Sequence, residues 1–177
     1  MLKPSFKIRS LLALAGVSLA SAVIAQGAAV PASDREFAQK AAAGGAAEVE
    51  GGKVAEQKAA NDKVKQFGAR MVQDHGKANE ELKQLASGKG LQLPGAPDAH
   101  HQQEMARMQK LSGTDFDKAY MDHMVKDHKK DVAEFRKQAS SSKDPELKAF
   151  AAKTLPTLEE HLKLAEATNA EVKKAKH

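Results

Sequence analysis

The side chains best suited to chemistry in this sequence are three histidines and a glutamate at helical positions. They are Glu48, His75, His128 and His161, one on the apolar stripe of each of four predicted long helices. The chain has no cysteine, so any metal site must use His, Met, Asp or Glu. Three neutral imidazoles and a carboxylate suit one divalent transition metal ion, namely zinc, copper or iron. We therefore predict these four residues as metal ligands.

Five further residues could support such a site: Met71, Met124, Asp74, Asp127 and Tyr120. Each methionine lies one helical turn before a predicted histidine ligand, and thioethers there would favour copper, especially the reduced ion. The aspartates and the tyrosine could orient the imidazoles by hydrogen bonds.

The same pattern also has an explanation without metal. A buried histidine often simply pairs with a hydrogen-bonding partner, and methionine at helical spacing usually fills core space. A buried Glu48–His75 pair would produce this pattern. The other histidines are expected to lie outside a site: His100, His101 and His177 in a loop or at the chain end, and His123 facing solvent or a helix edge.

The composition favours helices, because Ala, Lys, Glu and Gln dominate and the chain has one Tyr and no Trp. Apolar periodicity predicts helices over about 33–60, 62–87, 100–111, 114–140 and 145–172. Each candidate ligand lies within about two positions of the midpoint of its long helix, or about 3 Å of axial height. In a bundle of similar helices, the four side chains would share one layer.

Residues at the predicted helix ends support these bounds. The expected N-caps are Ser33, Asn61 and either Thr114 or Asp115. Gly88 and Gly90 are expected to end the second long helix, Pro145 to begin the last, and Pro156 to kink it. Glycines within the first helix suggest that a neighbouring backbone approaches closely: Gly44, Gly45, Gly51 and Gly52.

A five-residue sequence motif occurs twice in the chain. Met71-Val72-Gln73-Asp74-His75 returns as Met124-Val125-Lys126-Asp127-His128, 53 residues later and with four of five residues identical. The repeat predicts two related helical hairpins packed as a four-helix bundle.

The first residues are typical of an export signal. Lys3, Lys7 and Arg9 precede an uncharged run over 11–25, which at 15 residues is shorter than the roughly 20 needed to span a bilayer. We predict cleavage after Ala25, a periplasmic or secreted protein, and no membrane-spanning segment after cleavage. The predicted division is 1–25 signal peptide, 26–32 linker, 33–172 helical bundle and 173–177 basic tail.

Charge argues against nucleic acid as a partner. The formal net charge of +5 falls to +2 once the three basic residues of the predicted signal are removed. A domain with so small a charge and interspersed Lys and Glu has no basic stripe.

Several segments together resemble one known family: 47–55, 64–67, 71–79, 113–120 and 155–162. It is a bacterial family of exported, ferritin-like proteins catalogued as a domain of unknown function and often labelled as outer-membrane proteins. The resemblance covers nearly all of residues 33–170. It implies a ferritin-like four-helix bundle in the cell envelope, peripheral to any membrane, and no settled activity. A ferritin-type di-iron centre takes ligands from Glu-x-x-His motifs. Because the chain has no such motif, we do not expect a di-iron centre of this type.

The periodicity and the repeat thus predict an all-α protein, a four-helix bundle with one additional short helix, and the family resemblance implies that this bundle is ferritin-like. We expect it to bind a transition metal without catalysis, with a role in metal handling or envelope stress. Two alternatives stay open: a metal-free structural or stress-protective bundle acting through protein contacts, and a metal-dependent oxidoreductase. Metal identity, oligomeric state and partner are not specified by the sequence.

Overall fold

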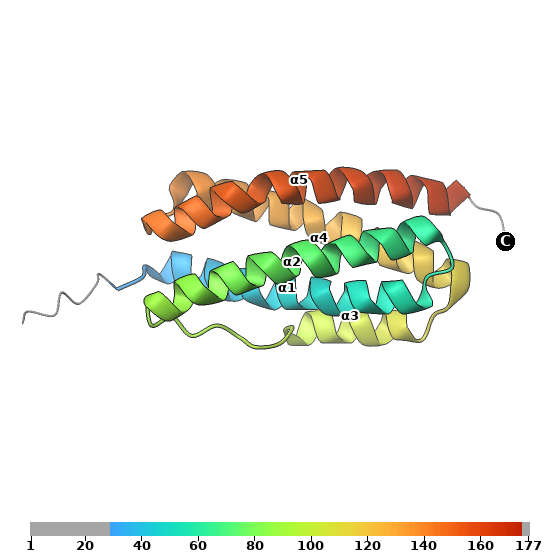
Figure 1. The fold of residues 1–177 in the computed structure, drawn as a ribbon, viewed down its shortest axis with the longest axis horizontal. Helices are drawn as coiled ribbons and strands as arrows, with labels where there is room; N and C mark the ends of the chain where they lie inside the picture. Colours follow the sequence, from blue (N-terminus) through green and yellow to red (C-terminus); the bar gives the residue numbers. More distant parts are fainter. Residues whose placement is uncertain (1–28, 175–177) are drawn as a thin grey trace, which may run out of the picture.

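The structure, a computed structural model, describes residues 29–174 (Figure 1). It has five helices: α1 (Ala32–Lys58), α2 (Asp62–Gly88), α3 (Ala99–Gln109), α4 (Gly113–Ser141) and α5 (Pro145–Lys174). Residues 29–174 contain no strand, which confirms the all-helical prediction and its four long helices and one short one. None of these helices is both long and apolar enough to cross a membrane. The predicted signal peptide lies outside the described residues.

Two of the predicted N-cap residues are wrong, although the helices begin close to the predicted positions. Asn61 caps α2 by accepting a hydrogen bond from the backbone N–H of Lys63 at 2.8 Å. In contrast, α1 begins before Ser33, directly after Pro31. Helix α4 begins at Gly113, whose φ of +57° turns the chain sharply from α3 and moves the start ahead of Thr114 and Asp115.

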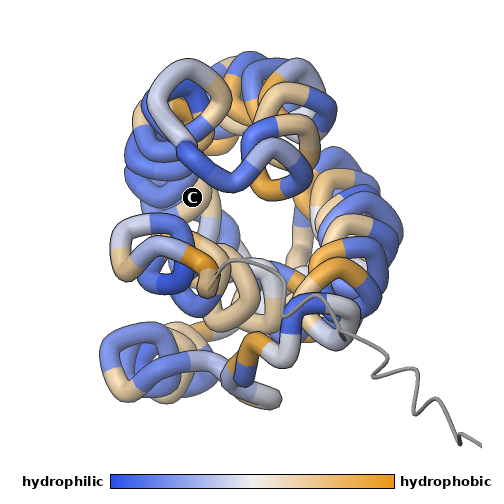
Figure 2. Tube along the Cα trace, turned by 90° about the vertical axis from the view of Figure 1, so that its left-hand side faces the viewer, coloured by the Kyte–Doolittle hydropathy of each residue, from blue (hydrophilic) through white to orange (hydrophobic). Residues whose placement is uncertain are grey.

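The four long helices form two antiparallel hairpins, α1–α2 and α4–α5, which lie face to face, with α3 alongside α1 (Figure 1). Viewed along the bundle, hydrophilic and hydrophobic residues alternate around the helices (Figure 2), as amphipathic packing requires. Glycines bring α1 and α2 together: a Cβ on Gly52 would lie 2.5 Å from the carbonyl oxygen of Gly68. The predicted close approach is therefore confirmed at Gly52, whereas a Cβ on Gly44 would meet nothing within 4 Å.

Each hairpin also caps the turn of the other with a buried carboxylate. Asp34 of α1 accepts hydrogen bonds from the backbone N–H groups of Lys143 and Asp144, at 3.1 and 2.8 Å. Asp117 of α4 accepts from those of Ala60 and Asn61, at 3.1 and 2.9 Å. These bonds satisfy backbone donors that a turn would otherwise leave unpaired, and they tie together the two ends of the bundle.

The core is divided into two hydrophobic clusters, one in each half of the bundle. The first contains Phe67, Met71, Phe116, Tyr120 and Met124 among its members, and the second Phe37, Leu82, Phe135, Phe150 and Leu158. On every long helix the residue predicted as a ligand falls between the two clusters in sequence, and all four are buried: Glu48, His75, His128 and His161. A polar layer thus separates the two apolar halves.

We predict that Gly52→Ala destabilises the bundle by about 1–3 kcal/mol, because the added methyl group would overlap the Gly68 backbone, which cannot rotate away. Gly44→Ala is the matched control in the same helix, and it should stabilise by up to about 1 kcal/mol because alanine favours helix. Urea unfolding midpoints measure both. Equal effects of the two substitutions would contradict the close approach.

Candidate metal centre

Three of the predicted ligands converge at the middle of the bundle. His75 of α2, His128 of α4 and His161 of α5 each offer one ring nitrogen, and these nitrogens lie within 4.8 Å of one another. The ring centroids are 5.4–5.7 Å apart. His128 and His161 are fully buried and His75 is 7% exposed. The centre therefore joins one side chain from the first hairpin with two from the second.

A backbone hydrogen bond orients the His128 ring. Its Nδ1 lies 3.0 Å from the carbonyl oxygen of Met124, which can only accept, so Nδ1 carries the proton. Nε2 of His128 is then a lone-pair donor, and it is buried with no hydrogen-bond partner in the part of the chain that the structure describes.

A chain of charged groups orients His161. Its Nε2 donates to Oδ2 of Asp74 at 2.9 Å, which leaves Nδ1 as the lone-pair donor, also buried and unpartnered among residues 29–174. Arg70 donates to the same carboxylate oxygen at 3.2 Å and holds Glu160 through two bonds of 3.2 and 2.8 Å. Burial alone would raise the pKa of Asp74, but the hydrogen bonds from His161 and Arg70 outweigh it and lower that pKa. Asp74 is therefore ionised, as a partner of a metal-binding imidazole should be.

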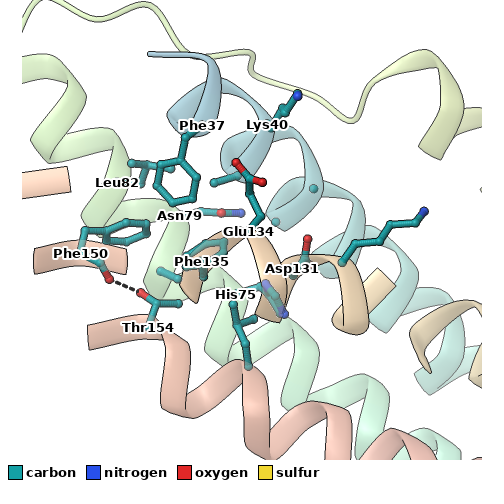
Figure 3. A pocket seen from close by; sticks show the side chains of 16 residues that line it. Phe37, Lys40, His75, Asn79, Leu82, Asp131, Glu134, Phe135, Phe150 and Thr154 are labelled. Carbon is teal, nitrogen blue, oxygen red and sulfur yellow. Dashed lines mark hydrogen bonds between the residues drawn. The ribbon is translucent and has the colours of Figure 1, made fainter. Parts of the chain in front are cut away.

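His75 is the least constrained of the three rings. Its Nε2 is buried without a partner within residues 29–174, and the ring lines a cavity of about 310 Å³. Figure 3 shows His75 at the edge of this cavity, with Asn79 and aromatic rings as further walls. Neither His128 nor His161 lines it. The cavity thus gives the His75 ring room to move.

Burial keeps all three imidazoles neutral. It lowers the pKa of His75 well below its ordinary value, and the neighbouring His128 and His161 lower it further. Burial, with a contribution from His161, lowers the pKa of His128 to about 4. Burial also lowers the pKa of His161, despite the opposing bond to Asp74. The neutral form is the one that binds metal ions.

Glu48 is buried beside this group but does not join it. Its Oε1 lies 3.7 Å from Nδ1 of His128, the protonated nitrogen on the side of the ring away from the lone pair. Burial, followed by the charges of Asp131 and Asp127, raises the pKa of Glu48 well above its ordinary value. Burial and the Glu48 charge likewise raise the pKa of Tyr120, whose hydroxyl has no partner among the described residues.

The remaining predicted residues lie around the centre in different ways. Met71 and Met124 are buried in the first hydrophobic cluster. Asp127 faces away: its Oδ2 lies 3.1 Å from Nε2 of His123 and 3.9 Å from that of His101 on α3. His123 is therefore partly buried where α4 meets α3 and does not face solvent, which leaves the predicted alternative of a helix edge. His100 and His101 lie in the first turn of α3, as the predicted helix over 100–111 implies, and not in a loop.

Sequence reasoning missed Arg70 and Glu160, which hold Asp74 in place. Arg70 could have been found, because it lies four residues before Asp74 on the same helix face. Glu160 could not, since its pairing depends on how α5 lies against α2.

The three nitrogens are suited to one metal ion. Metal–nitrogen bonds of about 2.0–2.1 Å place the ligand atoms about 3.4 Å apart in a tetrahedral site. The imidazoles would need to approach by at most about 1.4 Å, which small side-chain rotations supply. Each buried acceptor without a hydrogen bond costs about 1–3 kcal/mol, and a bound ion would satisfy all three at once.

Comparison with known families gives one match. A model of the family described as "Domain of unknown function (DUF4142)" matches residues 19–168. No curated protein and no solved structure matches the chain. The match supports the predicted resemblance to a domain of unknown function and leaves the ferritin-like description a prediction.

We predict that the metal-free protein loses stability as the pH falls from 6.5 toward about 4. Above 6.5, His128 is neutral in both the folded and the unfolded chain. Below it the unfolded chain binds a proton that the folded chain does not, so for His128 alone the free energy of unfolding decreases by on the order of 3 kcal/mol.

Urea unfolding at several pH values, with a chelator present, measures this loss. His128→Leu should reduce the pH dependence by the share of His128, because His75 and His161 still contribute. His123→Gln, at a less buried histidine of the same helix whose pKa burial also lowers, should reduce it less. An unchanged slope in His128→Leu would show that the buried ring does not resist protonation.

Proposed function

The chain belongs to the family described as a domain of unknown function, DUF4142, and we propose that its function is to bind one transition metal ion through His75, His128 and His161. One observation carries the proposal: three buried, neutral imidazoles from three helices present nitrogens within 4.8 Å of one another. Two of these rings are oriented by bonds to their other nitrogen, which is how proteins hold metal-binding histidines.

The surroundings favour binding over turnover. The unpartnered nitrogens of all three rings are out of contact with solvent, so a bound ion would be shielded from substrates as well as from water. A catalytic metal keeps a position open to water or substrate. We therefore propose a role in metal handling or in protection of the cell envelope rather than an enzyme.

The envelope location rests on the N-terminal sequence. Three basic residues followed by an uncharged run of 15 residues form an export pattern. A cysteine-free metal centre also suits an oxidising compartment, because imidazoles do not form disulfides.

A bound ion would also join the two hairpins. His75 belongs to α1–α2, whereas His128 and His161 belong to α4–α5. Coordination would add bonds across an interface that side-chain packing, the Asp34 and Asp117 caps, and polar pairs such as His161–Asp74 and Arg70–Glu160 already hold. Metal binding should therefore stabilise the whole bundle.

We predict that tag-free protein binds one equivalent of metal ion with loss of binding in His128→Gln. His123→Gln is the matched control, because His123 lies on the same helix, half-buried, outside the centre. At an ion concentration about 100 times the Kd, binding adds about 2.7 kcal/mol, which raises the Tm of a domain of this size by about 5–10 °C. Elemental analysis and thermal unfolding measure the two effects.

The opposite result is equally clear. Protein that takes up no zinc, copper or iron, and whose Tm is the same with each ion and with a chelator, would reject the metal site. A packing role in a metal-free bundle would then be the explanation of the histidine layer.

We also predict that Asp74→Asn weakens metal affinity by about 10–100-fold, because the amide holds the His161 ring less firmly and does not increase its basicity. Asp62→Asn is the control at an exposed position of the same helix, where the carboxylate pairs with Lys65 at the surface. Competition titration against a metal-binding dye gives both affinities. Equal affinity in the two variants would remove Asp74 from the site.

A further inference from the structure

We infer that the ion bound by this centre is monovalent copper, held by the three imidazoles alone in a three-coordinate arrangement. The inference rests on the proposed function and specifies its ion. Three features of the structure lead to it: the charge of the donors, their number and the side chains packed beside them.

The first feature is that the donor set carries no charge. His75, His128 and His161 offer neutral nitrogens in a buried layer. The nearest carboxylates do not compensate an ion: Glu48 lies behind the protonated nitrogen of His128, and Asp74 is shared by His161 and Arg70. The cost of transferring an ion from water into a low-dielectric interior scales with the square of its charge, so a divalent ion would cost four times as much as a monovalent one. Neutral donors in a buried layer therefore favour a single positive charge.

The second feature is the number of donors. Within residues 29–174 the group includes three histidines and no fourth His, Cys, Asp or Glu. Water cannot complete the set readily, because the metal-facing nitrogens are shielded from solvent and the cavity reaches only His75. Zinc takes four ligands, and divalent copper prefers four or more. Monovalent copper is stable with three.

The third feature is the distribution of soft side chains. All five methionines of residues 29–174 lie in the half of the bundle that holds the first cluster: Met71, Met105, Met108, Met121 and Met124. The second cluster is built from Phe, Leu, Val and Ala. Met71 and Met124 each precede a histidine of the centre by one turn. The buried cluster to which they belong excludes water from that side of the histidine layer and is rich in polarisable side chains, and both properties favour the reduced ion.

The test is an anaerobic titration of tag-free protein with monovalent copper against a chromophoric copper(I) chelator, and a parallel titration with divalent zinc against a zinc dye. We expect one copper ion per chain, bound about a hundredfold or more tightly than zinc. X-ray absorption at the copper edge should show three nitrogen neighbours and no sulfur. His128→Gln should abolish tight copper binding, whereas Met124→Leu, which keeps the core volume, should leave the affinity within about threefold.

Each outcome decides between the claims. Zinc bound as tightly as copper, and lost in His128→Gln, would overturn the copper inference and leave the metal-binding function standing. A sulfur neighbour in the absorption spectrum, with a large loss of affinity in Met124→Leu, would overturn the three-imidazole arrangement. Binding of neither ion would overturn both the inference and the proposed function.

Discussion

Burying an imidazole in a helical bundle keeps the ring neutral and leaves one nitrogen in need of a partner. The layer between the two hydrophobic clusters contains three such rings. One ring nitrogen of each lies within 4.8 Å of one from each of the others, and each ring has a buried nitrogen without a partner among residues 29–174. At about 1–3 kcal/mol for each unsatisfied acceptor, the layer has a cost comparable with the 5–15 kcal/mol that typically separates folded from unfolded protein. Whatever satisfies these nitrogens is therefore coupled to the stability of the whole bundle.

The helices of one hairpin are packed differently from the two hairpins against each other, and the histidine layer lies between the hairpins. Within the first hairpin, Gly52 and Gly68 let two backbones approach closely. Between the hairpins, bulky side chains such as Phe67, Tyr120 and Phe135 fill the core. At the two ends of the bundle, Asp34 and Asp117 accept hydrogen bonds from the backbone of the other hairpin. The histidine layer lies midway between these caps. The two hairpins are thus joined at their ends by carboxylates and in their middle by the imidazoles.

Apolar periodicity was enough to predict the helices and the burial of four residues: Glu48, His75, His128 and His161. In a bundle of helices of similar length, residues at the middle of each apolar face lie in one layer of the core. Periodicity could not predict which atoms meet. Glu48 has the right height and burial, yet it approaches the wrong nitrogen of His128. Likewise, Asp74 and Asp127 occupy equivalent positions of the repeated five-residue motif. Asp74 is hydrogen-bonded to His161, whereas Asp127 faces His101 of α3. Helix α3 packs against α4, and within residues 29–174 α2 has no corresponding short helix beside it, so the two aspartates have different surroundings.

The three rings are consequently held with unequal firmness. His161 is anchored through Asp74 and Arg70, and His128 through the Met124 carbonyl. The buried Nε2 of His75 has no hydrogen-bond partner among residues 29–174, and His75 alone of the three borders the cavity. If the centre binds an ion as proposed, His75 is the ring best placed to adjust, because hydrogen bonds already fix the orientation of the other two. Since that ring comes from the opposite hairpin, coordination by all three rings would add a further link between the two halves of the fold.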